Sequence, residues 1–104
     1  MARWLTRVVR RIRQAAREGA VRFTYKALRE MAACGEGYDA DDGRAILEGL
    51  SAGEFVLRLA GSGTGEWMYV FKPVVGEETL YVKVVLREGC TVISLHEDRP
   101  KRQS

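Results

Sequence analysis

The first half of the chain places apolar residues three or four positions apart, which is the spacing of amphipathic helices. In residues 1–19 an apolar stripe is surrounded by six arginines, and Gly19 supplies a helix stop. Residues 20–23 could form a short strand, and residues 24–37 predict a second helix that glycines end. Helices therefore dominate this half.

A third helical pattern covers residues 38–50 and begins in the string DADDG. Asp39 or Asp41 can cap its first turn, because exposed N–H groups and the helix dipole both favour a carboxylate there. The string also suggests a calcium loop, but its glycine falls one place too early and no twelve-position ligand pattern follows. We expect a cap, not a calcium site.

From Ser51 onward, apolar and polar residues alternate as in β-strands. Four strands are expected: 54–60, 66–75, 79–88 and 90–97. Short connections favour antiparallel pairing of consecutive strands, and the glycine-rich connection 61–65 leads into a strand, unlike a phosphate-binding loop. The polar tail from Asp98 should fray. The pattern predicts an α+β fold, one domain over residues 1–104, with N-terminal helices packed on one face of a twisted, mostly antiparallel sheet.

Composition narrows the class of protein. No apolar stretch approaches the roughly 18 to 20 residues of a membrane span. Cys34 and Cys90 form no CxxC pair, and with a single histidine no standard zinc set can be assembled. We expect a soluble, cytoplasmic protein without metal or cofactor, although an arginine-rich start is also compatible with organellar targeting.

Charge is distributed unevenly along the chain. Up to Tyr38 there are nine Lys and Arg against three acids, and from Asp39 there are eight against eleven. The first part thus carries a charge of +6 and the second −3. This asymmetry predicts an electropositive region that faces phosphates or an acidic partner.

Alternation also divides each expected strand into two faces. The core face, which the helices should cover, collects Phe55, Leu57, Leu59, Trp67, Tyr69, Phe71, Leu80, Val82, Val84, Leu86, Ile93 and Leu95. The other face collects Glu54, Val56, Arg58, Met68, Val70, Lys72, Tyr81, Lys83, Val85, Val92, Ser94 and His96. A solvated face would carry polar residues in any case, but it mixes Glu, Lys and Thr, whereas this one has a single acid. It is suited to meet negative charge.

RNA cleavage is a reaction that such a face could perform. The 2′-hydroxyl attacks the neighbouring phosphate, so the protein must supply a base, an acid and cations. Histidine can act as acid or base near neutral pH, lysine and arginine stabilise developing charge, and tyrosine can bind a phosphate or stack on a base. Pattern alone is weak support, because single histidines at strand ends are usually structural.

A family resemblance adds to this interpretation. The segments ILEGLSAGEF, EWMYVFKP, LYVKVVL and VISLHED, in this order, resemble the MqsR family of toxin–antitoxin ribonucleases, and EGAVRFTYKAL resembles the segment before the family's second helix. The resemblance implies a RelE-like toxin fold that cleaves mRNA without metal and is silenced by a cognate antitoxin. The family's proposed active positions, a lysine, a glutamine, a tyrosine and a lysine, fall on Leu57, Met68, Tyr81 and His96.

Only Tyr81 is retained at these positions. Leu57 is expected on the core face, so its role is lost unless Arg58 supplies the charge, and Met68 cannot donate a hydrogen bond as glutamine does. His96 keeps a protonatable group. We therefore predict an endoribonuclease in which His96 is the general acid or base and Tyr81 orients the phosphate or transfers the second proton. The predicted RNA contacts are Lys83, Lys72, Arg58, Ser94 and Met68.

Two alternatives stay open. The same face could belong to a non-catalytic module that binds RNA or protein, or to a degenerate toxin that is kept only as the partner of its antitoxin. The missing lysine and glutamine make both credible.

Overall fold

The computed structural model describes residues 2–35, 37–61 and 65–98. Its helices are α1 (Arg3–Glu18), α2 (Tyr25–Ala32) and α3 (Ala40–Glu48), followed by a 3₁₀ turn, η1 (Ala52–Glu54). Its strands are β1 (Val21–Phe23), β2 (Phe55–Ala60), β3 (Trp67–Phe71), β4 (Val74–Val75), β5 (Glu78–Val85) and β6 (Cys90–Glu97). The predictions for the tail beyond Asp98 and for most of the 61–65 connection lie outside the described residues.

The main strands are ordered β1-β6-β5-β3-β2, and β4 pairs with the start of β5. The pairs β2/β3, β3/β5 and β5/β6 are antiparallel, as predicted from the short connections. Two features were not predicted. β1 pairs with β6 in parallel, and the strand expected at 66–75 ends at Phe71, just before Pro73, which lacks an N–H for the ladder.

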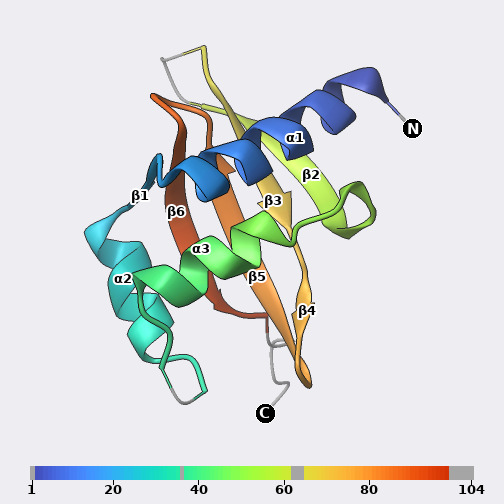
Figure 1. The fold of residues 1–104 in the computed structure, drawn as a ribbon. Helices are drawn as coiled ribbons and strands as arrows, with labels where there is room; N and C mark the ends of the chain where they lie inside the picture. Colours follow the sequence, from blue (N-terminus) through green and yellow to red (C-terminus); the bar gives the residue numbers. More distant parts are fainter. Residues whose placement is uncertain (1, 36, 62–64, 99–104) are drawn as a thin grey trace.

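Helices α1 and α3 lie across one face of the sheet (Figure 1). Ile12 of α1 and Leu47 of α3 are fully buried there against the apolar side of the central strands, which includes Phe71, Val82 and Leu95. The predicted α+β class, with an N-terminal helix packed on a mostly antiparallel sheet, is confirmed. We call the face that these two helices leave uncovered the open face.

Helix α1 follows its sequence pattern closely. Its buried residues form one stripe, and its six arginines are exposed. Gly19 ends the helix in the left-handed conformation at φ 74°, which a residue with a Cβ rarely adopts.

Helix α3 begins with the predicted aspartate cap. Asp39 accepts a hydrogen bond from the Asp42 N–H, and the Asp42 carboxylate accepts one from the Asp39 N–H, both at 2.9 Å. The Asp42 N–H also lowers the pKa of the Asp39 carboxyl. Gly43 has a packing role, because a Cβ there would lie 2.7 Å from Phe23 and 2.8 Å from Met31.

Helix α2 closes the outer edge of β6 beyond its short pairing with β1. The Thr24 hydroxyl accepts from the Ala27 N–H at 3.0 Å, capping the helix, and donates to the Ile93 carbonyl at 3.1 Å. The Leu95 N–H donates to the Glu30 carboxylate at 3.2 Å. Side chains of α2 thus satisfy backbone groups that a further strand would otherwise pair.

Two irregularities change which residues lie on which face. A register shift between Phe55 and Leu57 places Arg58 opposite Tyr69, so Arg58 lies on the helix-covered side and Leu57 and Leu59 lie on the open face. The predicted faces of β2 are therefore wrong from Leu57 onward, because a bulge reverses the alternation.

A second shift, between Lys83 and Val84, affects β6. It places Val92 opposite Val84 in the core, so the prediction that Val92 lies on the open face is also wrong. Ser94 and His96, which come after the shift, keep their predicted face.

The described part of the chain contains no helix that is both long and apolar enough to span a membrane. Cys34 and Cys90 are free and buried, as their interpretation as small core residues predicts.

Candidate active site on the open face

Tyr81 and His96 form the centre of the candidate site. They are direct partners across β5 and β6, and their rings stack with centroids 5.0 Å apart and planes 15° apart. Both residues are half-buried. The structure thus brings together the two residues predicted to be catalytic.

The histidine ring is fixed by a backbone contact. His96 Nδ1 lies 2.7 Å from the Glu97 carbonyl oxygen, which can only accept a hydrogen bond. Nδ1 therefore carries a proton and donates it, and the neutral ring presents a bare Nε2.

Lys83 and Ser94 occupy the next cross-strand position on the open face. Ser94 is only 2% exposed, and its hydroxyl accepts a hydrogen bond from Lys26 at 2.6 Å. The ammonium of Lys26 also contacts Glu30 at 2.9 Å. Ser94 therefore lies where it positions Lys26, and is itself nearly inaccessible.

Lys26 is a residue that sequence reasoning missed. It comes from α2, and its place beside Ser94 depends on how that helix packs against the edge of β6. Strand alternation carries no signal for such a contact.

Lys72 follows β3 and is paired with an acid. Its ammonium lies 3.1 Å from the Asp98 carboxylate, and both side chains are about one-third exposed, at 38% and 32%. Part of the charge predicted to contact RNA is thus neutralised within the protein.

Met68 and Leu57 both lie on the open face, but away from the Tyr81–His96 pair. Met68 is opposite Val85, four residues along β3 from the Lys72 position, or roughly 13 Å at strand spacing. Leu57 is opposite Val70, so the prediction that it faces the core is wrong. An apolar Leu57 cannot replace a lysine in binding phosphate.

Arg58 is separated from this site by the sheet itself. Its guanidinium lies between the Trp4 and Trp67 rings, 4.3 and 4.2 Å from their centroids. The prediction that Arg58 shares a face with Tyr81 and His96 is wrong, since the bulge in β2 turns it toward α1.

Acids lie closer to His96 than the strand pattern predicts. A groove of about 340 Å³ beside His96 is lined by Ala33, Cys34 and three carboxylates, those of Glu30, Glu97 and Asp98. Negative charge at this end disfavours a phosphate. Lys83 pairs with no acid among the described residues. A phosphate would therefore approach the Tyr81–His96 pair more favourably from the side of Lys83.

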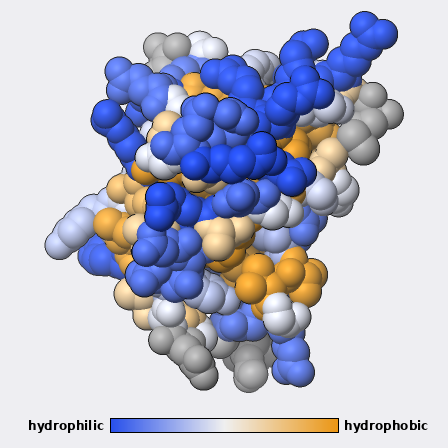
Figure 2. Space-filling view, viewed as in Figure 1, coloured by the Kyte–Doolittle hydropathy of each residue, from blue (hydrophilic) through white to orange (hydrophobic). Residues whose placement is uncertain are grey.

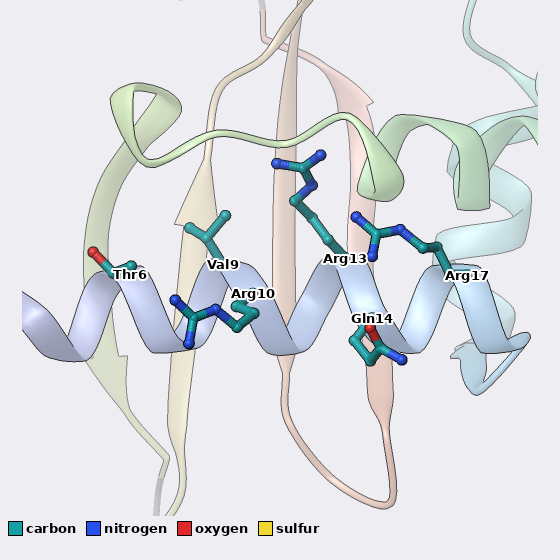
Figure 3. Close-up of a pocket in the computed structure, with 6 residues that line it drawn as sticks. All are labelled: Thr6, Val9, Arg10, Arg13, Gln14 and Arg17. Atoms are coloured by element: carbon teal, nitrogen blue, oxygen red, sulfur yellow. The ribbon is translucent and has the colours of Figure 1, made fainter.

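A second groove, of about 470 Å³, runs along α1 on the helix-covered side and is lined by Arg10, Arg13 and Arg17 (Figure 3). Arg13 Nε donates to the Glu48 carbonyl at 3.0 Å, and Arg17 lies 4.0 Å from the Glu48 carboxylate. Arg13 and Arg17 thus connect α1 to α3 and are remote from His96. Nowhere in residues 2–35, 37–61 and 65–98 do three or more His, Cys, Asp or Glu side chains gather as a metal site requires.

Fold and site together define a small α+β protein that covers one sheet face with helices and presents a stacked histidine and tyrosine with lysines on the other. A protein family described as motility quorum-sensing regulator, toxin of MqsA, matches residues 6–97. The chain therefore belongs to the MqsR toxin family, as the sequence resemblance predicts, and this is a family of toxins from toxin–antitoxin pairs. No curated protein matches the chain.

Proposed function

We propose that this toxin is an endoribonuclease that cleaves mRNA without metal and is silenced by a cognate antitoxin. The observation that carries the proposal is the His96 ring, anchored through Nδ1 and stacked on Tyr81, with Nε2 left for proton transfer. Membership of a toxin family supports the biological role, and these two side chains support the proposed chemistry.

The proposed reaction needs only proton transfer and charge stabilisation. The 2′-oxygen forms a bond to phosphorus while the bond from phosphorus to the 5′-oxygen breaks, which yields a 2′,3′-cyclic phosphate and a 5′-hydroxyl. Neutral His96 takes the 2′-hydroxyl proton through Nε2, or protonated His96 gives one to the departing oxygen. Tyr81 orients the phosphate or carries the other proton.

Lys83 is the main residue that binds the phosphate in this proposal. Its strand position places it beside the Tyr81–His96 pair, and a cation there stabilises the negative charge that builds up on the phosphate oxygens. Lys26, held by Ser94, adds a second cation to the extent that RNA competes with Glu30 for its ammonium. Lys72 contributes only to the extent that RNA competes with Asp98 for its ammonium.

The test is an assay on single-stranded RNA in the presence of EDTA, followed by analysis of the new ends. We expect fragments with 2′,3′-cyclic phosphate and 5′-hydroxyl ends. Fragments with 3′-hydroxyl and 5′-phosphate ends, or intact RNA, would refute the proposal. Adding the cognate antitoxin should stop the cleavage.

A second candidate is a module that binds RNA without cleaving it. It is favoured by the pairing of Lys72 and Lys26 with acids and by the three carboxylates beside His96. This alternative predicts salt-sensitive RNA binding, as phosphate contacts require, with no fragments in the same assay.

A further inference from the structure

Arg58 is held between the only two tryptophans of the chain. Trp4, on α1, packs against the core through Phe55, with ring centroids 5.4 Å apart. Trp67, on β3, lies on the outer side of Arg58 and is 42% exposed. The Trp4–Arg58–Trp67 stack therefore runs from the core to the surface.

This stack leaves two binding groups available. The indoles cover the two faces of the guanidinium, whose N–H donors lie in its plane and point sideways in the fork that matches a phosphate. The tryptophan faces hold this fork in place, so less freedom is lost when it binds. The exposed part of Trp67 can stack on an unpaired base.

Three arginines extend the positive charge from the stack along α1. Arg3, Arg7 and Arg11 are exposed and follow one another every four residues, about 6 Å apart along the helix. Arg7 and Arg11 lie three and seven positions after Trp4, which places them on the same side of the helix. No acid pairs with them in the part of the chain that the structure describes, in contrast to Arg17. Figure 2 shows the outer side of α1 as strongly hydrophilic.

We propose that the Trp4–Arg58–Trp67 stack, with Arg3, Arg7 and Arg11, is a second RNA-binding surface. An unpaired base stacks on Trp67, and backbone phosphates contact Arg58 and the arginines of α1. Aromatic faces combined with a cationic track are how proteins bind single strands, whereas paired bases offer no free face. The choice of RNA over DNA rests on the proposed function. The surface lies across the sheet from His96, so it holds RNA outside the cleavage site.

The test measures binding of a short labelled RNA whose 2′-hydroxyls are all methylated, so that it cannot be cleaved. We expect Trp67→Leu to weaken binding at least about fivefold, because one stacking contact is lost. Arg58→Lys should also weaken it, since lysine keeps the charge but loses the planar fork. RNA should quench the tryptophan fluorescence of the wild type, because both tryptophans belong to the stack.

Helix α2 offers matched controls. Tyr25 is 79% exposed, and the Arg29 guanidinium lies over its ring at 5.7 Å. Tyr25→Leu and Arg29→Lys therefore remove an exposed aromatic ring and a guanidinium from α2, outside the proposed surface. Both should bind RNA like the wild type. Arg7→Gln should lower the slope of log affinity against log salt by about 0.7, the value for one phosphate contact on a single strand, and Arg29→Gln should not.

Normal binding by folded Trp67→Leu and Arg58→Lys would overturn the inference, as would an equal loss in the α2 controls. If circular dichroism shows that Trp67→Leu does not fold, the RNA affinities of Arg58→Lys and Trp67→Phe are compared with that of the wild type instead. The methylated RNA reports binding without cleavage, so a failure of this inference and a failure of cleavage are separate results.

Discussion

Tyr81 and His96 meet because strand alternation puts both on the open face and the strands pair in a register that sets them directly opposite each other. In β5 and β6, alternation assigns Tyr81, Lys83, Ser94 and His96 to the correct face, although the register shift after Lys83 reverses the face of Val92. In β2 both faces are apolar, since Val56 lies between Phe55 and Leu57. The pattern there cannot reveal a bulge, which is why the predicted face of Arg58 is wrong.

The Tyr81 hydroxyl can be separated from the Tyr81 ring by mutation. Tyr81→Phe keeps the stack on His96 and removes only the group that would orient the phosphate, so we expect cleavage to fall at least about tenfold with an unchanged melting temperature. Tyr25→Phe, on the exposed surface of α2, is the matched control. Equal rates for the wild type and Tyr81→Phe would remove the hydroxyl from the mechanism.

Cys90 links stability to pH. Burial raises the pKa of its thiol from 9.0 to about 12, so as the pH rises the unfolded chain loses this proton first. The contribution of the protonated Cys90 thiol to the free energy of unfolding is complete below about pH 9 and is lost between pH 9 and 12. Urea unfolding at pH 8 and pH 10 should show that Cys90→Ala loses about 1 kcal/mol less stability over this interval than the wild type. Equal losses in the two proteins would contradict the assignment.

At the scale of elements, periods and stop signals predicted the three helices and the strands, including the aspartate cap of α3 and Gly19 after α1. The sequence pattern does not predict two contacts between elements: the parallel pairing of β1 with β6, and the packing of α2 along the edge of β6. Both depend on contacts between residues almost 70 positions apart, for which local periodicity carries no information. The packing of α2 along β6 is what places Lys26 beside Ser94 in the site.

Thr24 tests how α2 is joined to the sheet. Its hydroxyl both caps α2 and contacts the Ile93 carbonyl, so Thr24→Ala should lower the free energy of unfolding by about 1 to 2 kcal/mol. Thr24→Ser keeps the hydroxyl and should retain most of the stability. The check is chemical denaturation of the three proteins, and a loss in Thr24→Ser as large as that in Thr24→Ala would show that the methyl group, not the hydroxyl, matters.

At the scale of the molecule, the sheet separates two surfaces of different chemistry. The open face carries the proton-transfer pair and Lys83, and the helix-covered side carries the arginines of α1 and the Trp4–Arg58–Trp67 stack. The charge asymmetry in the sequence predicted a basic region but not its location. Strand alternation predicts that Arg58 shares a face with Lys72 and Lys83, whereas in the structure Arg58 lies on the helix-covered side.

The central claim, that His96 transfers a proton during metal-free RNA cleavage, is tested most directly by one comparison. Single-turnover cleavage of the same RNA is measured with EDTA for the wild type and His96→Ala, at protein concentrations that saturate binding. We predict a rate at least about a hundredfold lower for His96→Ala, as expected for lost acid–base catalysis, with RNA affinity unchanged. A His96→Ala protein that cleaves at the wild-type rate would contradict the account.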